Sequence, residues 1–208
     1  MSLRYRLSLL IPALCVGIAA LAVTSASALT PVFINEIHYD NAGTDAGERI
    51  EIAGPAGTSL QFWKIRLYNG AGGTVYDTIL LAGIIPNQCN GYGTIAYAWD
   101  PIQNGAPDGM ALVDNNGILV QFLSYEGSFV AVGGEANGIM STDIGVSESG
   151  TTPVGFSLQL VGIGLTYEQF AWNIAGPESF TTCNPGQYFD HPLPVARTTW
   201  GAVKALYR

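Results

Sequence analysis

Six oxygen-bearing side chains fall within fourteen residues near the start of the chain, and together they could bind a hard cation. They are Asn35, Glu36, Asp40, Asn41, Asp45 and Glu48. Calcium takes six to eight oxygen ligands, which carboxylates and amide carbonyls supply. The spacing is not that of an EF-hand, and Asp and Asn side chains also fold back onto backbone amides in such loops. Turn chemistry is the favoured interpretation, and the alternative is a calcium site formed by Asn35, Glu36, Asp40, Asp45 and Glu48.

Patterns typical of catalysis are scarce. His38 and His191 are the only histidines, and neither belongs to a metal-ligand motif. The sequence around Ser157 lacks the second glycine of a nucleophile elbow. His38 lies in an alternating segment, which favours a structural or surface histidine. We therefore predict no catalytic residue and no cofactor other than calcium.

The N-terminal 28 residues have the three parts of a secretory signal. Two arginines precede an apolar run, Leu7–Val23, and small residues end at Ala28. We expect cleavage after Ala28, and hence a protein secreted or held in the cell envelope that meets a membrane only through the cleaved signal. The alternative is a retained anchor, although the run contains Pro12 and is shorter than the roughly 20 residues of a membrane span.

Charge divides the remaining chain into an acidic body and a basic tail. Residues 29–190 contain all sixteen acids and three bases, a net charge of −13. Nucleic acids bind proteins largely through Lys and Arg on phosphates, so the composition argues against a nucleic-acid partner for this body. Residues 191–208 contain three bases and no acid.

Two cysteines, Cys89 and Cys183, remain once Cys15 leaves with the signal. In an oxidising compartment an even number of cysteines predicts a disulfide. The alternative is a pair of buried thiols.

The distribution of glycine predicts an all-β fold. The chain has 26 glycines in 208 residues, and Asn-Gly pairs at 69–70, 90–91, 104–105, 116–117 and 137–138 mark tight turns. In Trp63–Leu67 apolar residues alternate with Lys64 and Arg66, which should point away from the core. Nine short strands and no long helix indicate a β-sandwich with a glycine-rich excursion at 126–155. The expected strands are Val32–Tyr39, Arg49–Ala53, Trp63–Tyr68, Thr74–Leu81, Tyr92–Ala98, Met110–Val113, Ile118–Ser124, Phe156–Val161 and Gln169–Trp172.

The basic tail has an amphipathic pattern of its own. A proline-containing spacer, 191–195, leads to a segment that could form a short helix, with four apolar side chains along one stripe. These are Trp200, Val203, Leu206 and Tyr207. So short a helix is marginal alone, so it needs a surface. That surface is either the acidic sandwich of the same chain or an envelope partner.

Extended motifs carry a family resemblance over residues 31–189. They are Ile34–Asp40, Gly43, Asp45, Gly47-Glu48, Ile50–Ile52, Asn104–Gly109, Ala111–Val113, Ser124–Gly127, Thr152–Gly155, Ser157–Leu160, Trp172 and Asn184–Gly186. Together they resemble the bacterial lamin-tail domain. The resemblance implies an immunoglobulin-like β-sandwich, with one departure at Arg49, where the family usually has a large apolar residue.

Two functions are compatible with these observations. The leading hypothesis is an exported, non-enzymatic binding or structural module whose partner is an envelope or extracellular protein or glycan. Some bacterial relatives join such a domain to a secreted nuclease, for which 208 residues leave no room in this chain. The alternative is therefore an accessory domain or subunit of a secreted nuclease or phosphoesterase.

Overall fold

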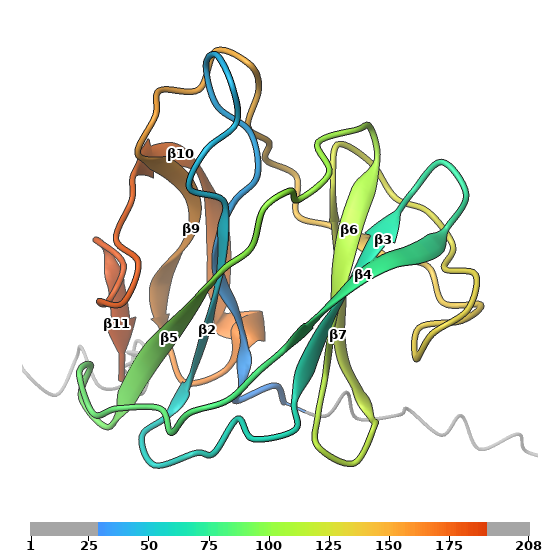
Figure 1. Ribbon diagram of the computed structural model, residues 1–208. Helices are drawn as coiled ribbons and strands as arrows, with labels where there is room; N and C mark the ends of the chain where they lie inside the picture. Colours follow the sequence, from blue (N-terminus) through green and yellow to red (C-terminus); the bar gives the residue numbers. More distant parts are fainter. Residues whose placement is uncertain (1–28, 191–208) are drawn as a thin grey trace, which may run out of the picture.

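A computed structural model describes residues 29–190, which fold as two β-sheets packed in a sandwich-like arrangement (Figure 1). The six-stranded sheet runs in the order β10-β9-β1-β2-β5, with β11 pairing β9. Its strands are β1 (Phe33–His38), β2 (Arg49–Pro55), β5 (Tyr92–Ala98), β9 (Phe156–Gly164), β10 (Phe170–Pro177) and β11 (Gln187–Phe189). The five-stranded sheet runs in the order β4-β3-β6-β7-β8. Its strands are β3 (Lys64–Asn69), β4 (Thr74–Leu80), β6 (Asp108–Val113), β7 (Leu119–Tyr125) and β8 (Thr142–Asp143).

The all-β prediction is confirmed within the described residues. All nine predicted strands are present with shifted ends; β10, for example, extends to Pro177 while Gln169 ends a single 3-10 turn, Tyr167–Gln169. The prediction missed β8 and β11, which have only two and three residues and too little pattern to be recognised. The predicted short helix near the C-terminus lies outside the described residues. No helix within 29–190 is long and apolar enough to cross a membrane.

Apolar side chains from the inner faces of both sheets form the core. Ile37, Ile50 and Ile52 of the first sheet share one cluster with Ile65 and Leu67 of the second, and each is at most 1% exposed. Lys64 and Arg66 alternate with these last two and both pair with Glu135 on the outer face, as their pattern predicted.

A bulge in β1 decides which residues face outward. The β1–β2 register shifts between Ile34 and Glu36, so two consecutive residues, Asn35 and Glu36, both lie on the outer side. Gln121 of the opposite sheet accepts the Ile34 N–H at 2.8 Å, which binds the two sheets together at this point.

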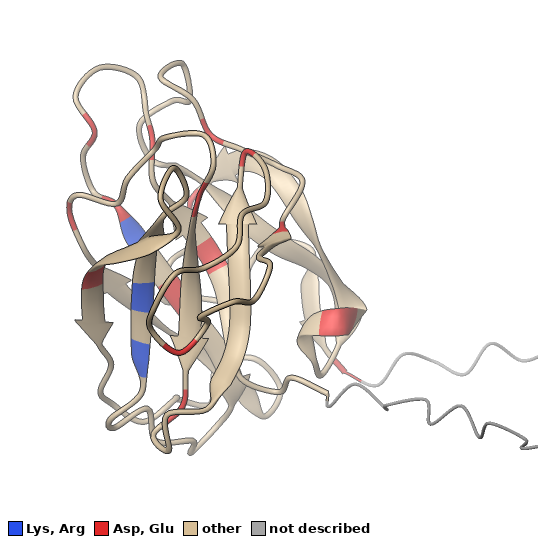
Figure 2. Cartoon of the chain, turned by 90° about the vertical axis from the view of Figure 1, so that its right-hand side faces the viewer, with Lys and Arg blue, Asp and Glu red and all other residues tan. Residues whose placement is uncertain are grey.

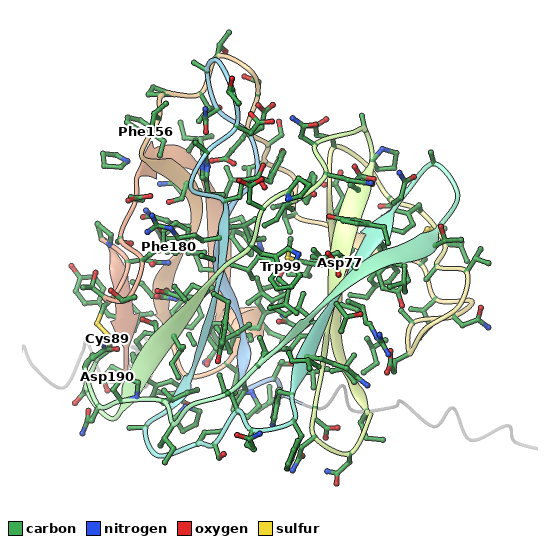
Figure 3. The ribbon with its side chains drawn as sticks, in the orientation of Figure 1. Asp77, Cys89, Trp99, Phe156, Phe180 and Asp190 are labelled. Carbon is green, nitrogen blue, oxygen red and sulfur yellow. A yellow bond between two sulfur atoms is a disulfide. The ribbon has the colours of Figure 1, made fainter. Side chains whose placement is uncertain are left out.

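Side chains also close one edge of the sandwich, between β5 and β4. Trp99 donates its indole N–H to Asp77 at 3.1 Å (Figure 3). The Tyr97 hydroxyl reaches the Ala82 carbonyl at 2.6 Å. These contacts join the edges of the two sheets.

Candidate functional site

The loops at the upper end of the sandwich in Figure 1 include loop 39–48, which contains Asp40, Asp45 and Glu48 of the acidic residues singled out in the sequence. Loops 39–48 and 144–155 meet there through a hydrogen bond from Ala42 N–H to the Thr152 carbonyl at 2.8 Å. Loops 99–107 and 126–128 complete this loop end. Figure 2 marks acidic residues in red along several of the loops.

Asn41 organises loop 39–48 from within. Its side-chain amide donates to the carbonyls of Ala42 and Thr44, at 3.1 and 3.2 Å, and its Oδ1 accepts the Ala46 N–H. Asp45 in turn accepts the Asn41 N–H through Oδ1. This is the turn chemistry that the composition of the loop favoured.

Glu48 is a buried carboxyl at the base of the loop end. One of its oxygens accepts the Ile102 N–H, while Oε1 is buried without a hydrogen-bond partner. Burial, together with the nearby carboxylates of Asp100 and Asp45, raises the pKa of Glu48 to about 7. Glu48 therefore holds a proton over much of the acidic range and loses it near neutrality.

A buried ion pair, His38–Glu148, fixes loop 144–155 to the end of β1. His38 Nδ1 lies 3.0 Å from Glu148 Oε1, and Nε2 lies 3.3 Å from the Ala46 carbonyl. Because both ring nitrogens face acceptors, the geometry matches a protonated imidazolium. Burial alone would lower the pKa of His38, but the Glu148 carboxylate outweighs it and raises that pKa. The prediction of a structural histidine is confirmed.

Asn35 and Glu36 lie away from the loop end, on the outer face of the first sheet. Glu36 accepts hydrogen bonds from the Ser157 hydroxyl at 2.5 Å, the Ser179 N–H at 2.8 Å and the Gln159 amide at 3.2 Å. Ser179 belongs to residues 178–186, which we call the covering segment. This segment seals the outer face over β1 and β2.

Glu51 shares the same buried layer. Its Oε1 accepts the Asn35 amide at 2.9 Å and its Oε2 accepts the Thr181 N–H of the covering segment at 2.5 Å. Burial raises the pKa of Glu51 to about 8, and the nearby Glu36 carboxylate adds to the shift. Glu36 and Glu51 are both fully buried, and neither pairs with a Lys or Arg of residues 29–190.

The five candidate calcium ligands thus fall into two groups. Asn35 and Glu36 are engaged beneath the covering segment, whereas Asp40, Asp45 and Glu48 belong to the loop end. Within residues 29–190 no three His, Cys, Asp or Glu side chains come close enough to hold one metal ion. Because Asn35 and Glu36 are engaged by Glu51, Ser157 and Ser179 on the outer face, the five do not form a common ligand sphere.

A disulfide between Cys89 and Cys183 anchors the covering segment, as predicted (Figure 3). It joins the turn before β5 to the segment across 94 residues of sequence. Asn90 and Gly91 of that turn have φ values of 53° and 87°, the left-handed backbone that an Asn-Gly pair adopts most readily. The disulfide is in keeping with an exported protein.

The sequence analysis missed the roles of Glu51 and Glu148. Glu51 alternates with inward isoleucines, a pattern that normally marks an exposed side chain, and only the covering segment buries it. Glu148 lies in the glycine-rich excursion, where no periodicity identifies a buried residue. The predicted signal, residues 1–28, and the tail residues Trp200, Val203, Leu206 and Tyr207 lie outside the described residues.

The bases of residues 29–190 leave the acids of the loop end unneutralised. Lys64 and Arg66 both pair with Glu135. Arg49 lies 3.8 Å from Glu178 and packs over the Phe180 ring. None of the three pairs with the remaining partly or fully exposed acids of the loop end, which are Asp45, Asp100, Glu126 and Asp143.

Comparison with known proteins supplies no relative: no family model, curated protein or solved structure matches this chain.

Proposed function

We propose that the chain is an exported, non-enzymatic binding or structural module of lamin-tail type, with its binding surface at the acidic loop end. The observation that carries this proposal is a rigid frame that presents unneutralised charge. The His38–Glu148 pair and the Asn41 hydrogen bonds fix the loops. Asp45, Asp100, Glu126 and Asp143 have no Lys or Arg partner among residues 29–190.

Such a surface selects a partner by charge. Carboxylates on a fixed frame attract cationic proteins or glycans and repel phosphate polymers, because opposite charges steer association and like charges oppose it. The partner expected here is a basic envelope or extracellular component. Lamin-tail membership and an immunoglobulin-like arrangement belong to the same proposal and are supported by the motifs given above.

Binding of an envelope extract to the immobilised chain tests the proposal. A variant with Asp100→Asn and Glu126→Gln should retain less of the basic component, and added salt should weaken capture by the native chain. A control variant, Asp100→Glu with Glu126→Asp, keeps the charge of the loop end and should bind normally. Equal capture by both variants would contradict a role for the loop end.

The alternative enzymatic role has a direct test. The purified chain should not cleave DNA or simple phosphodiesters with any divalent metal. Metal-dependent cleavage that survives repurification and disappears in Glu48→Gln would replace the binding proposal with a phosphoesterase.

A further inference from the structure

The loops at the lower end of the sandwich in Figure 1 form the end opposite to the acidic loop end. The loops of this end expose large apolar side chains, among them Leu29, Phe62, Ile84 and Ile118, which are between 61% and 74% exposed. Phe62 also has a φ of 67°, a backbone conformation that a bulky residue rarely adopts. Apolar surface gathered at one end of a domain marks an interaction site.

A groove of about 390 Å³ lies at this end. One wall is the segment Leu29–Val32, the other is formed by Trp63, Leu119 and Val120, and Asp114 also lines it. The N-terminal wall is held in place because Glu168 accepts the Thr30 hydroxyl at 2.8 Å. The groove therefore has the size of a small ligand site and is mostly apolar, with carboxylates close by.

The chain's own C-terminal residues have the complementary composition. Residues 191–208 contain the apolar side chains Trp200, Val203, Leu206 and Tyr207, three bases and no acid. They follow Asp190, and both ends of the described chain lie at the lower end of the sandwich (Figures 1 and 2). Eighteen residues can extend up to about 60 Å, so the tail can reach the groove.

We propose that residues 195–208 dock in this groove of the same molecule, with aromatic and aliphatic side chains against Trp63 and Leu119 and with Lys204 or Arg208 near Asp114. Asp114 is available for this contact because no Lys or Arg of residues 29–190 pairs with it. Its carboxylate accepts hydrogen bonds within its own turn, from the Asn116 and Ile118 N–H at 2.8 and 2.7 Å and from the Asn116 side-chain amide at 3.4 Å. A tether this short raises the local concentration of the tail to roughly millimolar, which favours the chain's own tail over a separate partner.

Cysteine cross-linking of the exported full chain tests the contact. The pair Ile118→Cys and Tyr207→Cys should form an intramolecular disulfide under mild oxidation. The matched pair Val154→Cys and Tyr207→Cys should not, since Val154 is similarly exposed, 67% against 61%, but belongs to the loop end. Cross-linked dimers from the first pair would mean that a second copy occupies the groove and would overturn the proposal, as would equal cross-linking in both pairs.

A labelled peptide of residues 195–208 provides an independent measurement. Fluorescence anisotropy should show saturable binding of the peptide to a chain truncated at residue 194. The affinity of the peptide for the full chain should be lower by about tenfold or more, because the groove of that chain is already filled. Asp114→Asn, which keeps the turn's hydrogen-bond acceptor, should weaken peptide binding to the truncated chain. No binding to the truncated chain, or equal binding to both chains, would refute self-docking whatever the loop end binds.

Discussion

Replacing Glu51 by Gln should change how the stability of the domain depends on pH. Glu51 is fully buried beneath the covering segment, and its pKa rises from 4.5 to about 8 on burial. Gln has the shape and the neutral state of the protonated carboxyl. Its amide group can also donate a hydrogen bond to Thr94 Oγ1 on β5. This oxygen is buried and has no hydrogen-bond partner apart from the side chain at position 51.

The magnitude follows from proton linkage. Between about pH 5 and 8 the folded chain keeps the Glu51 proton that the unfolded chain releases, so the free energy of unfolding falls as pH rises. One proton corresponds to at most about 1.4 kcal/mol per pH unit, or up to about 3 kcal/mol between pH 5 and 7.5. Glu48, with a pKa of about 7, acts in the same direction and remains in the variant.

Urea unfolding followed by tryptophan fluorescence at pH 5, 6.5 and 8 measures this dependence. At pH 5 Glu51→Gln should equal the native chain or be less stable, since its amide nitrogen cannot accept the Thr181 N–H. As the pH rises towards 8, the free energy of unfolding of the variant should increase relative to that of the native chain, by about 1 kcal/mol or more for each pH unit. Asp143→Asn, an exposed change of equal charge, is the control. Identical pH slopes for Glu51→Gln and the native chain would refute a proton held by Glu51.

Three further outcomes are expected. Glu148→Gln leaves the His38 charge buried without its counterion and should cost about 3–5 kcal/mol by chemical unfolding, and a loss below about 1 kcal/mol would contradict the buried ion pair. Replacing Cys89 and Cys183 by Ser opens a loop of 94 residues and should lower stability by about 4–5 kcal/mol, which calorimetry can check against the reduced native chain. Millimolar Ca²⁺ should leave the melting temperature within about 1 °C of its value in chelator, because the candidate ligands are divided between two places. A rise of several degrees that Asp45→Asn abolishes would instead establish a calcium site.

Local pattern was sufficient for nine of the eleven strands in the described residues and for the turns between them. Period-two alternation placed Ile50, Ile52, Ile65 and Leu67 on the inner faces, because successive side chains of a strand point to opposite sides. Asn-Gly pairs marked tight turns, since both residues tolerate positive φ. Counting cysteines was enough to predict the disulfide once the signal was set aside.

Tertiary structure alone decided where the carboxylates lie and which of them are buried. One bulge in β1 turned Asn35 and Glu36 to the outer face, so a run that reads as a single acidic cluster became two separate sites. The covering segment then buried Glu51, although its place in an alternating strand indicates exposure. Burial of this kind depends on contacts between residues more than a hundred positions apart, such as Glu51 with Thr181, and no local periodicity encodes them. The sequence by itself thus determined the longer strands, the turns and the disulfide, whereas packing across distant segments decided which acids are buried and which are exposed.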